Sequence, residues 1–358
     1  MEYDFIIIGG GIAGVSCAGR LAKCGRVLLL EGEPVLAHHA SGRSAALYEP
    51  RYGLAPVVAL SLASEPYFRS AANVLTPRGM MIVGKAADEA AFKTDCALMA
   101  LEPMGFDDAR AMVPILNPET VAHVGFADHA WDIDTDLLLQ GFARAARSDG
   151  AEILTKAPVT AIVREGAGWR VTSAQGEHRG RILVNAAGAW ADVVAELAGV
   201  APMGITPLRR SMARIPAPGG HDVSRWPMIF AAGEAWYCKP DAGALIVSPA
   251  EEDATTPHDA FADDLVLAEG LARYEEMVTE PVTRVLANWA GLRSFAPDRV
   301  PVIGFDVAHP AFFWLAGQGG YGFQSAPMAS QLAVELLTGR APEIDAATVT
   351  SLSPRRFA

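Results

Sequence analysis

Apolar and polar positions at the start of the chain follow the order of a strand, a turn, a helix and a second strand. Residues 5–8 are continuously apolar, as is typical of a parallel strand that is buried on both faces. Glycines cluster at 9–14, and a helix-like run then reaches Lys23. A second apolar run covers 27–30 and ends in Glu31. This pattern predicts the strand, helix and second strand of a βαβ unit.

Two later segments repeat the pattern of an apolar strand that ends in small residues. The first covers 181–192 and carries two alanines and a glycine at 186–188, which let the backbone lie against a ligand. The second covers 312–339, where a strand meets four glycines within 317–322 before a long helix. A second glycine-rich helix N-terminus predicts a grip on the other end of a long ligand.

The middle of the chain has short apolar segments separated by turns, as is typical of an antiparallel sheet. Residues 79–85, 211–217 and 236–250 are predicted as strands with turns. Residues 262–278 are predicted as an amphipathic helix. The chain therefore combines an α/β part with an α+β part.

The glycine spacing and an acidic residue predict a dinucleotide site. Gly9, Gly11 and Gly14 form G-x-G-x-x-G, which provides a tight turn, close approach of a pyrophosphate and close helix–strand packing. Glu31, at the end of the second strand, is placed to accept both ribose hydroxyls. A plain βαβ unit with glycines that only tighten the turn is the alternative, but it does not explain Glu31. NAD would leave the glycines at 317–322 unexplained, so FAD is favoured.

Composition and charge exclude several classes of protein. The 358 residues allow two domains that share an interface. A net charge of -12 with only five lysines argues against a nucleic-acid surface. Four scattered cysteines suit a reducing compartment and provide no metal signature, so no metal is expected. Without a basic leader or a spanning apolar run, we expect a cytoplasmic protein, with peripheral association with the inner membrane as the alternative.

Several motifs in one order make the chain similar to a known family. They are "GRSAALYEPRYG" (42–53), "DIDTD" (132–136), "NAAGAW" (185–190), "RRS" (209–211), "YCKPDAG" (237–243), "WAGLRSF" (289–295), "QGGYG" (318–322) and "LSPRR" (352–356). With these motifs the chain resembles the D-amino-acid oxidase and glycine oxidase group of flavoproteins, and within it most closely the D-arginine dehydrogenases.

The resemblance implies a doubly wound Rossmann-type FAD domain that is interleaved with a substrate domain built on an antiparallel sheet. Prolines at 77, 207 and 281 and changes in composition near 136 and 204 are consistent with such crossings. The expected division is 1–76, 137–204 and 287–358 for the FAD domain, and 77–136 and 205–286 for the substrate domain.

The resemblance also implies which residues contact the cofactor. They are Gly9, Gly11, Ile12, Ala13, Gly14, Glu31, Ser41, Gly42, Arg43, Ser44, Ala45, Ala46, Val159, Ala187, Gly188, Trp190, Gly291, Gly319, Gly320, Tyr321, Gly322 and Gln324. His39 lies where some relatives tether the flavin through histidine. The D-arginine dehydrogenases bind FAD without such a bond, so non-covalent FAD is expected.

The catalytic group implied by the resemblance centres on Arg293. This arginine lies within an apolar stretch, where an unpaired charge is costly, so it must find an anion. By the resemblance that anion is the substrate carboxylate; a structural carboxylate is the alternative. Arg210 would be a second cation, and Tyr237 and Tyr52 would hydrogen-bond the carboxylate, Tyr52 from a lid. The Gly320 carbonyl would accept from the substrate amine.

The substrate pocket departs from the arginine-specific pattern. Met80 replaces a glutamate that would pair with a guanidinium, and Leu47 replaces a histidine in the lid. Both replacements are apolar, so basic substrates should lose their charge partner. Glu49 and Arg51 also lie in the lid, where they would either be solvated or alter selectivity.

The expected activity is FAD-dependent oxidative deamination of a small, neutral or apolar D-amino acid. Hydride would pass from Cα to flavin N5, and the imino acid would become a 2-oxo acid and ammonia. Alternatives are a secondary-amine (sarcosine- or opine-like) oxidase, a 2-hydroxy-acid dehydrogenase, or a subunit that only passes electrons or binds ligand. The hydroxy-acid version would need a base, and the motif positions offer no histidine. The electron acceptor (oxygen, quinone or another carrier) and the oligomeric state stay open.

Overall fold

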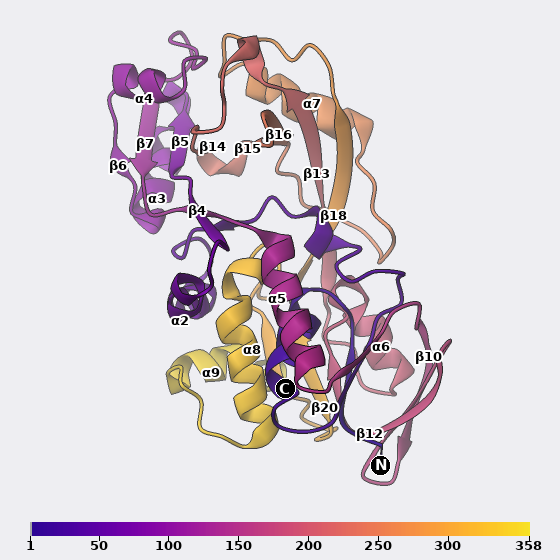
Figure 1. Ribbon diagram of the computed structural model, residues 1–358. Helices are drawn as coiled ribbons and strands as arrows, with labels where there is room; N and C mark the ends of the chain where they lie inside the picture. Colours follow the sequence, from indigo (N-terminus) through magenta and orange to yellow (C-terminus); the bar gives the residue numbers. More distant parts are fainter. Residues whose placement is uncertain (1) are drawn as a thin grey trace.

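The computed structural model describes residues 2–358, which form two large sheets with helices packed around them. In Figure 1 the half with both chain ends lies below, and the half with the second sheet lies above. The first sheet has the order β10-β11-β12-β1-β2-β9, with β20 also beside β12 and β19 beside β20. Its strands are β1 (Tyr3–Ile8), β2 (Val27–Leu30), β9 (Glu152–Leu154), β10 (Val159–Glu165), β11 (Gly168–Ser173), β12 (Gly176–Asn185), β19 (Val302–Phe305) and β20 (Phe312–Ala316).

The centre of the first sheet is parallel and is buried on both faces. β1 pairs in parallel with β2 and β12, and β12 pairs in parallel with β20. Ile7 and Leu29 belong to the core on one face, whereas Ile6 and Leu28 belong to the core on the other. This two-sided burial explains the continuous apolar run at 5–8. The helices of this half are α1 (Ile12–Leu21), α2 (Ala55–Ser70), α5 (Thr135–Ser148), α6 (Ala191–Leu197), α8 (Gly322–Thr338) and α9 (Ala346–Leu352).

The second sheet is mostly antiparallel and has nine strands in the order β17-β13-β16-β15-β14-β5-β7-β6, with β18 beside β13. Only β14 and β5 run in parallel within it. Its strands are β5 (Met80–Gly84), β6 (Glu102–Pro103), β7 (His123–Ala127), β13 (Thr206–Pro216), β14 (Met228–Ala231), β15 (Tyr237–Asp241), β16 (Ala244–Ser248), β17 (Asp253–Ala254) and β18 (Ala287–Phe295). Its helices are α3 (Glu89–Met99), α4 (Phe106–Met112) and α7 (Asp264–Glu275).

A small third sheet lies where the two halves meet. It consists of β3 (Leu47–Tyr48), β8 (Trp131–Ile133) and β4 (Leu75–Pro77). Asp132 of β8 accepts from Arg78 Nε at 2.7 Å and pairs with Lys239 Nζ at 2.9 Å. Lys239 also donates to the Ala46 carbonyl at 2.9 Å. These polar contacts fix the segment before β3 against the second sheet.

The fold class predicted from the sequence is confirmed: a parallel α/β half is interleaved with a half built on an antiparallel sheet. The predicted helix at 262–278 is shorter, because the Asp263 side chain caps α7 by accepting from two backbone amides. The domain boundaries remain a proposal. Residues 287–295, which the predicted division assigns to the FAD domain, form β18 and pair along their length with β13 of the second sheet. No helix within residues 2–358 has the length and apolar character needed to cross a bilayer.

Candidate cofactor and substrate site

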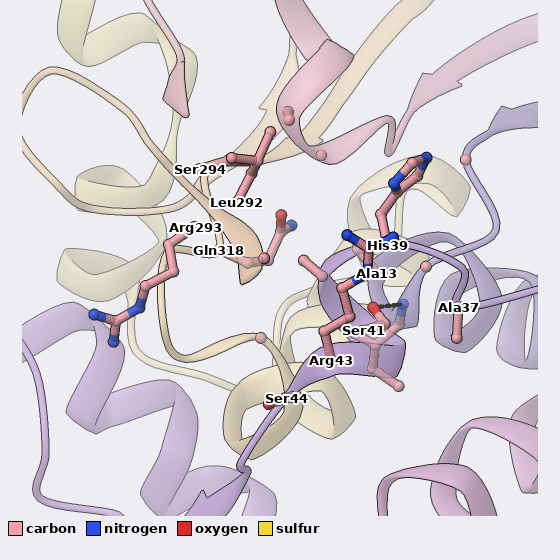
Figure 2. A pocket seen from close by; sticks show the side chains of 18 of the residues that line it. Ala13, Ala37, His39, Ser41, Arg43, Ser44, Leu292, Arg293, Ser294 and Gln318 are labelled. Atoms are coloured by element: carbon pink, nitrogen blue, oxygen red, sulfur yellow. Dashed lines mark hydrogen bonds between the residues drawn. The ribbon is translucent and has the colours of Figure 1, made fainter. Parts of the chain in front are cut away.

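A long cavity of about 520 Å³ lies between the two sheets and is lined by both halves of the molecule. One end is formed by the turn between β1 and α1, and the other by β13, β14, β15 and β18. Figure 2 shows Arg293 across the cavity from Ser41 and Ala37. A cavity of this length, bounded by the carboxyl ends of parallel strands, is where doubly wound sheets bind nucleotides.

Two of the three glycines in the first motif are required by the protein itself. Gly9 has φ +113°, and a Cβ there would lie 2.4 Å from the Ala186 carbonyl oxygen. A Cβ at Gly14 would lie 2.0 Å from the Gly9 carbonyl oxygen. These contacts permit the tight turn and the close packing of α1.

Gly11 is different, because a Cβ there would come close to only one side-chain atom and to no backbone atom. The nearest atom to a Cβ at this position is Ser41 Oγ at 3.2 Å, and the backbone φ is -78°. Gly11 borders the cavity at the N-terminus of α1, where backbone amides and the helix dipole favour a phosphate. A glycine that the protein does not need for its own packing is consistent with a ligand that lies against it.

The end of the cavity beside the β1–α1 turn, called the nucleotide end below, presents one acid and two apolar side chains. Glu31 Oε2 accepts from Gly10 N at 2.5 Å, and Glu31 Oε1 accepts from Glu33 N at 2.8 Å. Val193 and Leu197 lie one turn apart on α6, line the cavity and are 41% and 38% exposed. Apolar side chains with this exposure, beside an acid that fits ribose hydroxyls, form a surface for the flat face of a base.

The loop between β2 and β3 covers the middle of the cavity. Ser41 Oγ accepts from Ile12 N at 3.0 Å, which holds the loop against α1. Arg43 donates to the carbonyls of Ala260 and Ala290 at 2.8 and 3.0 Å and pairs with Asp259. The loop is therefore tied to both halves of the molecule.

The structure gathers nearly all of the predicted site residues around this cavity. Of the predicted cofactor residues, only Gly14, Gly42 and Tyr321 do not line it. The predicted substrate residues that line it are Leu47, Glu49, Tyr52, Met80, Arg210, Tyr237, Arg293 and Gly320. Their individual roles stay predictions.

One buried and one partly buried arginine meet a glutamate that was not predicted from the sequence. Arg210 is 4% exposed, and its Nη2 lies 3.3 Å from Glu252 Oε1. Arg293 Nη1 also lies 3.3 Å from this oxygen. Arg299, which does not line the cavity, pairs with Glu252 at 2.8 Å. Glu251 also interacts with Arg210, so two carboxyl groups lie among three guanidinium groups, and net positive charge remains for an anionic ligand.

Tyrosines and a glycine surround the Arg293 guanidinium. Burial alone would lower the pKa of Arg293, but the neighbouring Tyr52 and Tyr237 raise it overall, so the group keeps its charge. Burial raises the pKa of Tyr52, whose hydroxyl therefore keeps its proton. Tyr237 Oη donates to Met212 Sδ at 3.3 Å. A Cβ at Gly320 would overlap the guanidinium, at 1.7 Å from Arg293 Nη2.

The remaining wall of the substrate end is apolar. Leu47 and Met80 line it as predicted, and Met80 is almost fully buried. Met212, Met228 and Phe230 complete this wall and were missed by the sequence reading. The signal available for them was weak: β14 is a four-residue apolar strand, and only its pairing with β5 and β15 reveals which side chains face the cavity.

Glu49 is not a solvated loop residue, as one reading of the sequence had it, but is 1% exposed and borders the cavity. Its Oε1 accepts from Arg51 N at 2.9 Å. Burial raises the pKa of Glu49 to about 7, and the Arg51 amide lowers it only in part. The folded protein therefore disfavours the ionised carboxylate.

A pH-dependent loss of stability should follow from Glu49. The unfolded chain releases this proton near pH 4.5 and the folded chain near pH 7, so stability falls as pH rises through this window. Glu49→Gln removes this titration. The free energy of unfolding of the variant minus that of the wild type should therefore be larger at pH 8 than at pH 4.5, by up to about 3 kcal/mol. Thermal unfolding of both proteins at the two pH values measures this. A difference in stability between the two proteins that is the same at both pH values would contradict a raised pKa of Glu49.

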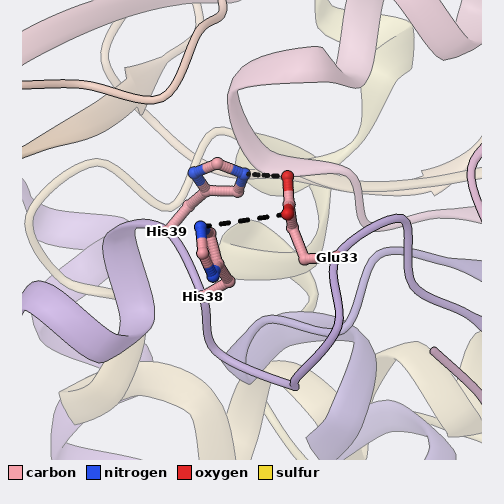
Figure 3. Close-up of side chains that lie close together, drawn as sticks. All are labelled: Glu33, His38 and His39. Carbon is pink, nitrogen blue, oxygen red and sulfur yellow. Dashed lines mark hydrogen bonds and ion pairs between the residues drawn. The ribbon is translucent and has the colours of Figure 1, made fainter. Parts of the chain in front are cut away.

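His39 lies at the nucleotide end of the cavity. Its Nε2 lies 3.0 Å from Glu33 Oε1, and its ring lies tilted by 42° against that of Trp190, with 4.6 Å between centroids. Figure 3 shows His38 on the other oxygen of Glu33, at 3.8 Å. No metal was predicted from the sequence, but these three side chains are close enough to ligate one ion. Within this group His39 Nε2 and Glu33 Oε1 are in hydrogen-bonding contact at 3.0 Å.

Comparisons with known proteins give a family match over most of the chain. Residues 4–336 match the family model described as DAO, FAD dependent oxidoreductase. The tRNA 5-methylaminomethyl-2-thiouridine biosynthesis bifunctional protein MnmC of Ralstonia nicotianae is 26% identical, over 85% of this chain and 49% of that protein. This chain therefore spans about half the length of that relative. N-methyl-L-tryptophan oxidase of Citrobacter koseri is 24% identical, over 96% of this chain and 97% of that protein.

Solved structures show the same fold. Glycine oxidase from Geobacillus kaustophilus superposes with a TM-score of 0.82 at 21% identity, over 99% of this chain and 98% of that one. L-proline dehydrogenase from P. horikoshii gives 0.84 at 22% identity, with the same coverage. L-alpha-glycerophosphate oxidase from Mycoplasma pneumoniae, with FAD bound, gives 0.83 at 20% identity, over 97% of each chain.

Proposed function

The chain belongs to the DAO family of FAD-dependent oxidoreductases, and we propose that it oxidises the carbon–nitrogen bond of a small D-amino acid. The observation that carries the proposal is the pair of guanidinium groups on the apolar end of the cofactor cavity, that of the buried Arg210 and that of the partly buried Arg293. This arrangement suits an α-carboxylate on a compact, largely apolar molecule. Within the family, the motifs favour a likeness to the D-arginine dehydrogenases.

The residues present fit FAD. Gly11 and the α1 N-terminus would receive the pyrophosphate, Glu31 the ribose hydroxyls, and Val193 with Leu197 the adenine. The second glycine-rich turn, Gly319–Gly322, and the loop around Arg43 would hold the other end. When bound, FAD supplies the acceptor for a hydride from the substrate Cα.

The protein's own contribution is orientation. Arg293 would bind the carboxylate through its planar fork, with Tyr52 and Tyr237 as further donors. The Gly320 carbonyl would accept from the amine, which binds neutral so that its lone pair assists hydride loss. The substrate loses two electrons and two protons to become an imino acid, and water then releases the 2-oxo acid and ammonia. No dedicated base is needed for the neutral amine.

Purified protein is expected to be yellow and to release FAD on acid precipitation. His39 Nε2 is engaged by Glu33 at the nucleotide end, and this position supports non-covalent binding. The absorbance and the flavin content of the supernatant after precipitation test the point. Flavin that stays with the precipitate would show a covalent bond, and colourless protein that binds NAD would overturn the cofactor site.

The apolar wall should set the preference among D-amino acids. Leu47 and Met80 offer no charge partner, and each buried methylene adds about 0.8 kcal/mol. D-leucine and D-methionine are therefore expected to exceed D-arginine in kcat/KM. Met80→Glu restores an acid and should raise kcat/KM for D-arginine relative to D-leucine. A wild-type enzyme that prefers D-arginine would show that Met80 does not set selectivity.

A secondary-amine oxidase is the second candidate. It is favoured by the relatives whose names denote such substrates, N-methyl-L-tryptophan oxidase and L-proline dehydrogenase. The arginine pair serves these substrates equally, because they carry the same carboxylate. Anaerobic bleaching of the bound flavin by a panel of D- and L-amino acids, N-methyl amino acids and 2-hydroxy acids separates the candidates. Bleaching by N-methyl amino acids alone would replace the proposed activity with this one.

A further inference from the structure

Among the described residues that line the cavity, Glu49 is the only acidic side chain at the substrate end; Glu252 lies behind the lining, on Arg210 and Arg293. Among the described residues that line it, the two other acids are Glu31 and Glu33, and both lie at the nucleotide end. The substrate end also contains Arg210 and Arg293, so a carboxylate and two guanidinium groups border the same apolar space. A cavity with both signs of charge fits a ligand that has an anion at one place and a cation at another.

The partners of Glu49 account for only one of its two oxygens. Oε1 accepts from the Arg51 backbone amide at 2.9 Å. Oε2 is buried and makes no hydrogen bond. His129 Nε2 lies 3.4 Å from Oε2, but the same nitrogen lies 3.0 Å from the Met99 carbonyl, which is the better placed acceptor. If Glu49 served only to accept a hydrogen bond from Arg51 N, one oxygen would be enough, and Oε2 would have no role in the turn.

The surroundings of Glu49 make that second oxygen costly. Leu47, Met80 and Phe230 belong to the apolar group on this side of the cavity. Removing a carboxyl oxygen from water without a hydrogen bond is unfavourable, and removing a carboxylate is more so. Such a group is stabilised when a donor enters the cavity, most of all a cationic one.

Building on the proposed function, we propose that Glu49 recognises the distal end of the substrate side chain. It extends the range of the pocket from apolar D-amino acids to those with an apolar stem that ends in a primary amine, whereas the larger, planar guanidinium of D-arginine still lacks the acid that Met80 replaces. Leu47 and Met80 would pack against the methylene stem, and Glu49 Oε2 would accept from the terminal ammonium. Glu49 thus acts as a residue that determines specificity, separate from the carboxylate clamp.

D-lysine and D-norleucine provide a matched test, because they share the carbon chain and differ in the terminal amine. The measured quantity is the ratio of kcat/KM for D-lysine to that for D-norleucine, with the FAD-loaded enzyme. Glu49→Gln keeps the size of the side chain and an oxygen for Arg51 N, and it should lower the ratio at least tenfold. Glu234→Gln is the control, since Glu234 acts on Tyr52 through space but does not line the cavity. Its ratio should match that of the wild type.

The outcomes separate this inference from the proposed function. A ratio that is unchanged in Glu49→Gln, or that falls equally in Glu234→Gln, would overturn the role of Glu49. The wild type alone gives a second test: an enzyme that oxidises D-norleucine but not D-lysine would also overturn it. Failure to oxidise either compound, together with turnover of N-methyl amino acids, would instead overturn the proposed D-amino-acid activity.

Discussion

Replacing Arg293 with methionine is expected to raise the KM for the substrate by a factor on the order of 10² to 10³, with flavin content near that of the wild type. Truncating one partner of a buried, hydrogen-bonded charge pair typically costs about 2–5 kcal/mol. Methionine keeps much of the bulk and removes the planar fork. The loss should therefore be one of carboxylate binding and not of folding.

The position of Arg293 explains why its effect should be large. Its side chain is 16% exposed and faces Tyr52 and Gly320 in the cavity, so little water can replace it. A substrate carboxylate would enter a site that has lost half of its cationic charge. Arg210 would remain, but its Nη2 is already shared with Glu252. Binding by Arg210 alone should not compensate.

Arg299→Met is the matched control for this experiment. Arg299 also pairs with Glu252, yet it is 44% exposed on its side chain and does not line the cavity. Its loss should change KM by only a few fold, because exposed ion pairs contribute about 0–1 kcal/mol. Steady-state kinetics with D-leucine compare the two variants. If Arg293→Met has the KM of the wild type, or if both variants weaken binding equally, the clamp is wrong.

The fold could be predicted from the sequence where one physical rule dominates. The βαβ unit is an example, because two-sided burial and the glycine turn leave few other arrangements. β18 is less direct: residues 287–295 were assigned to the FAD domain from the sequence, and they pair along their length with β13 of the second sheet. This pairing joins residues about 80 positions apart, so the local sequence pattern of either strand does not reveal its partner.

The candidate site shows the same division. Arg293 could be found because an arginine in an apolar stretch must have an anionic partner. Glu252 could not, because it follows another glutamate in a polar loop, and only the tertiary structure brings it to three arginines. Gly320 was predicted for its carbonyl, and the structure adds a steric reason, since any side chain there would displace the Arg293 guanidinium.

Replacing Gly11 with alanine is expected to yield folded protein that has lost its flavin. In the structure a methyl group at this position would touch only Ser41 Oγ, at 3.2 Å, and the φ of -78° suits any residue. The change at the helix N-cap should cost about 1 kcal/mol of stability. The same methyl group would occupy the space at the α1 N-terminus where the pyrophosphate must approach the backbone.

Gly14→Ala provides the contrast, because its methyl group would lie 2.0 Å from the Gly9 carbonyl oxygen. That variant should lose stability whether or not FAD is present, since α1 must move away from β1. Circular dichroism and thermal unfolding of the FAD-free proteins measure stability, and titration with FAD measures binding. We expect Gly11→Ala to unfold near the wild-type temperature and to bind FAD weakly, and Gly14→Ala to unfold early. A Gly11→Ala protein that binds FAD as tightly as the wild type would show that the pyrophosphate lies elsewhere. It would also contradict the proposed direction of the cofactor along the cavity.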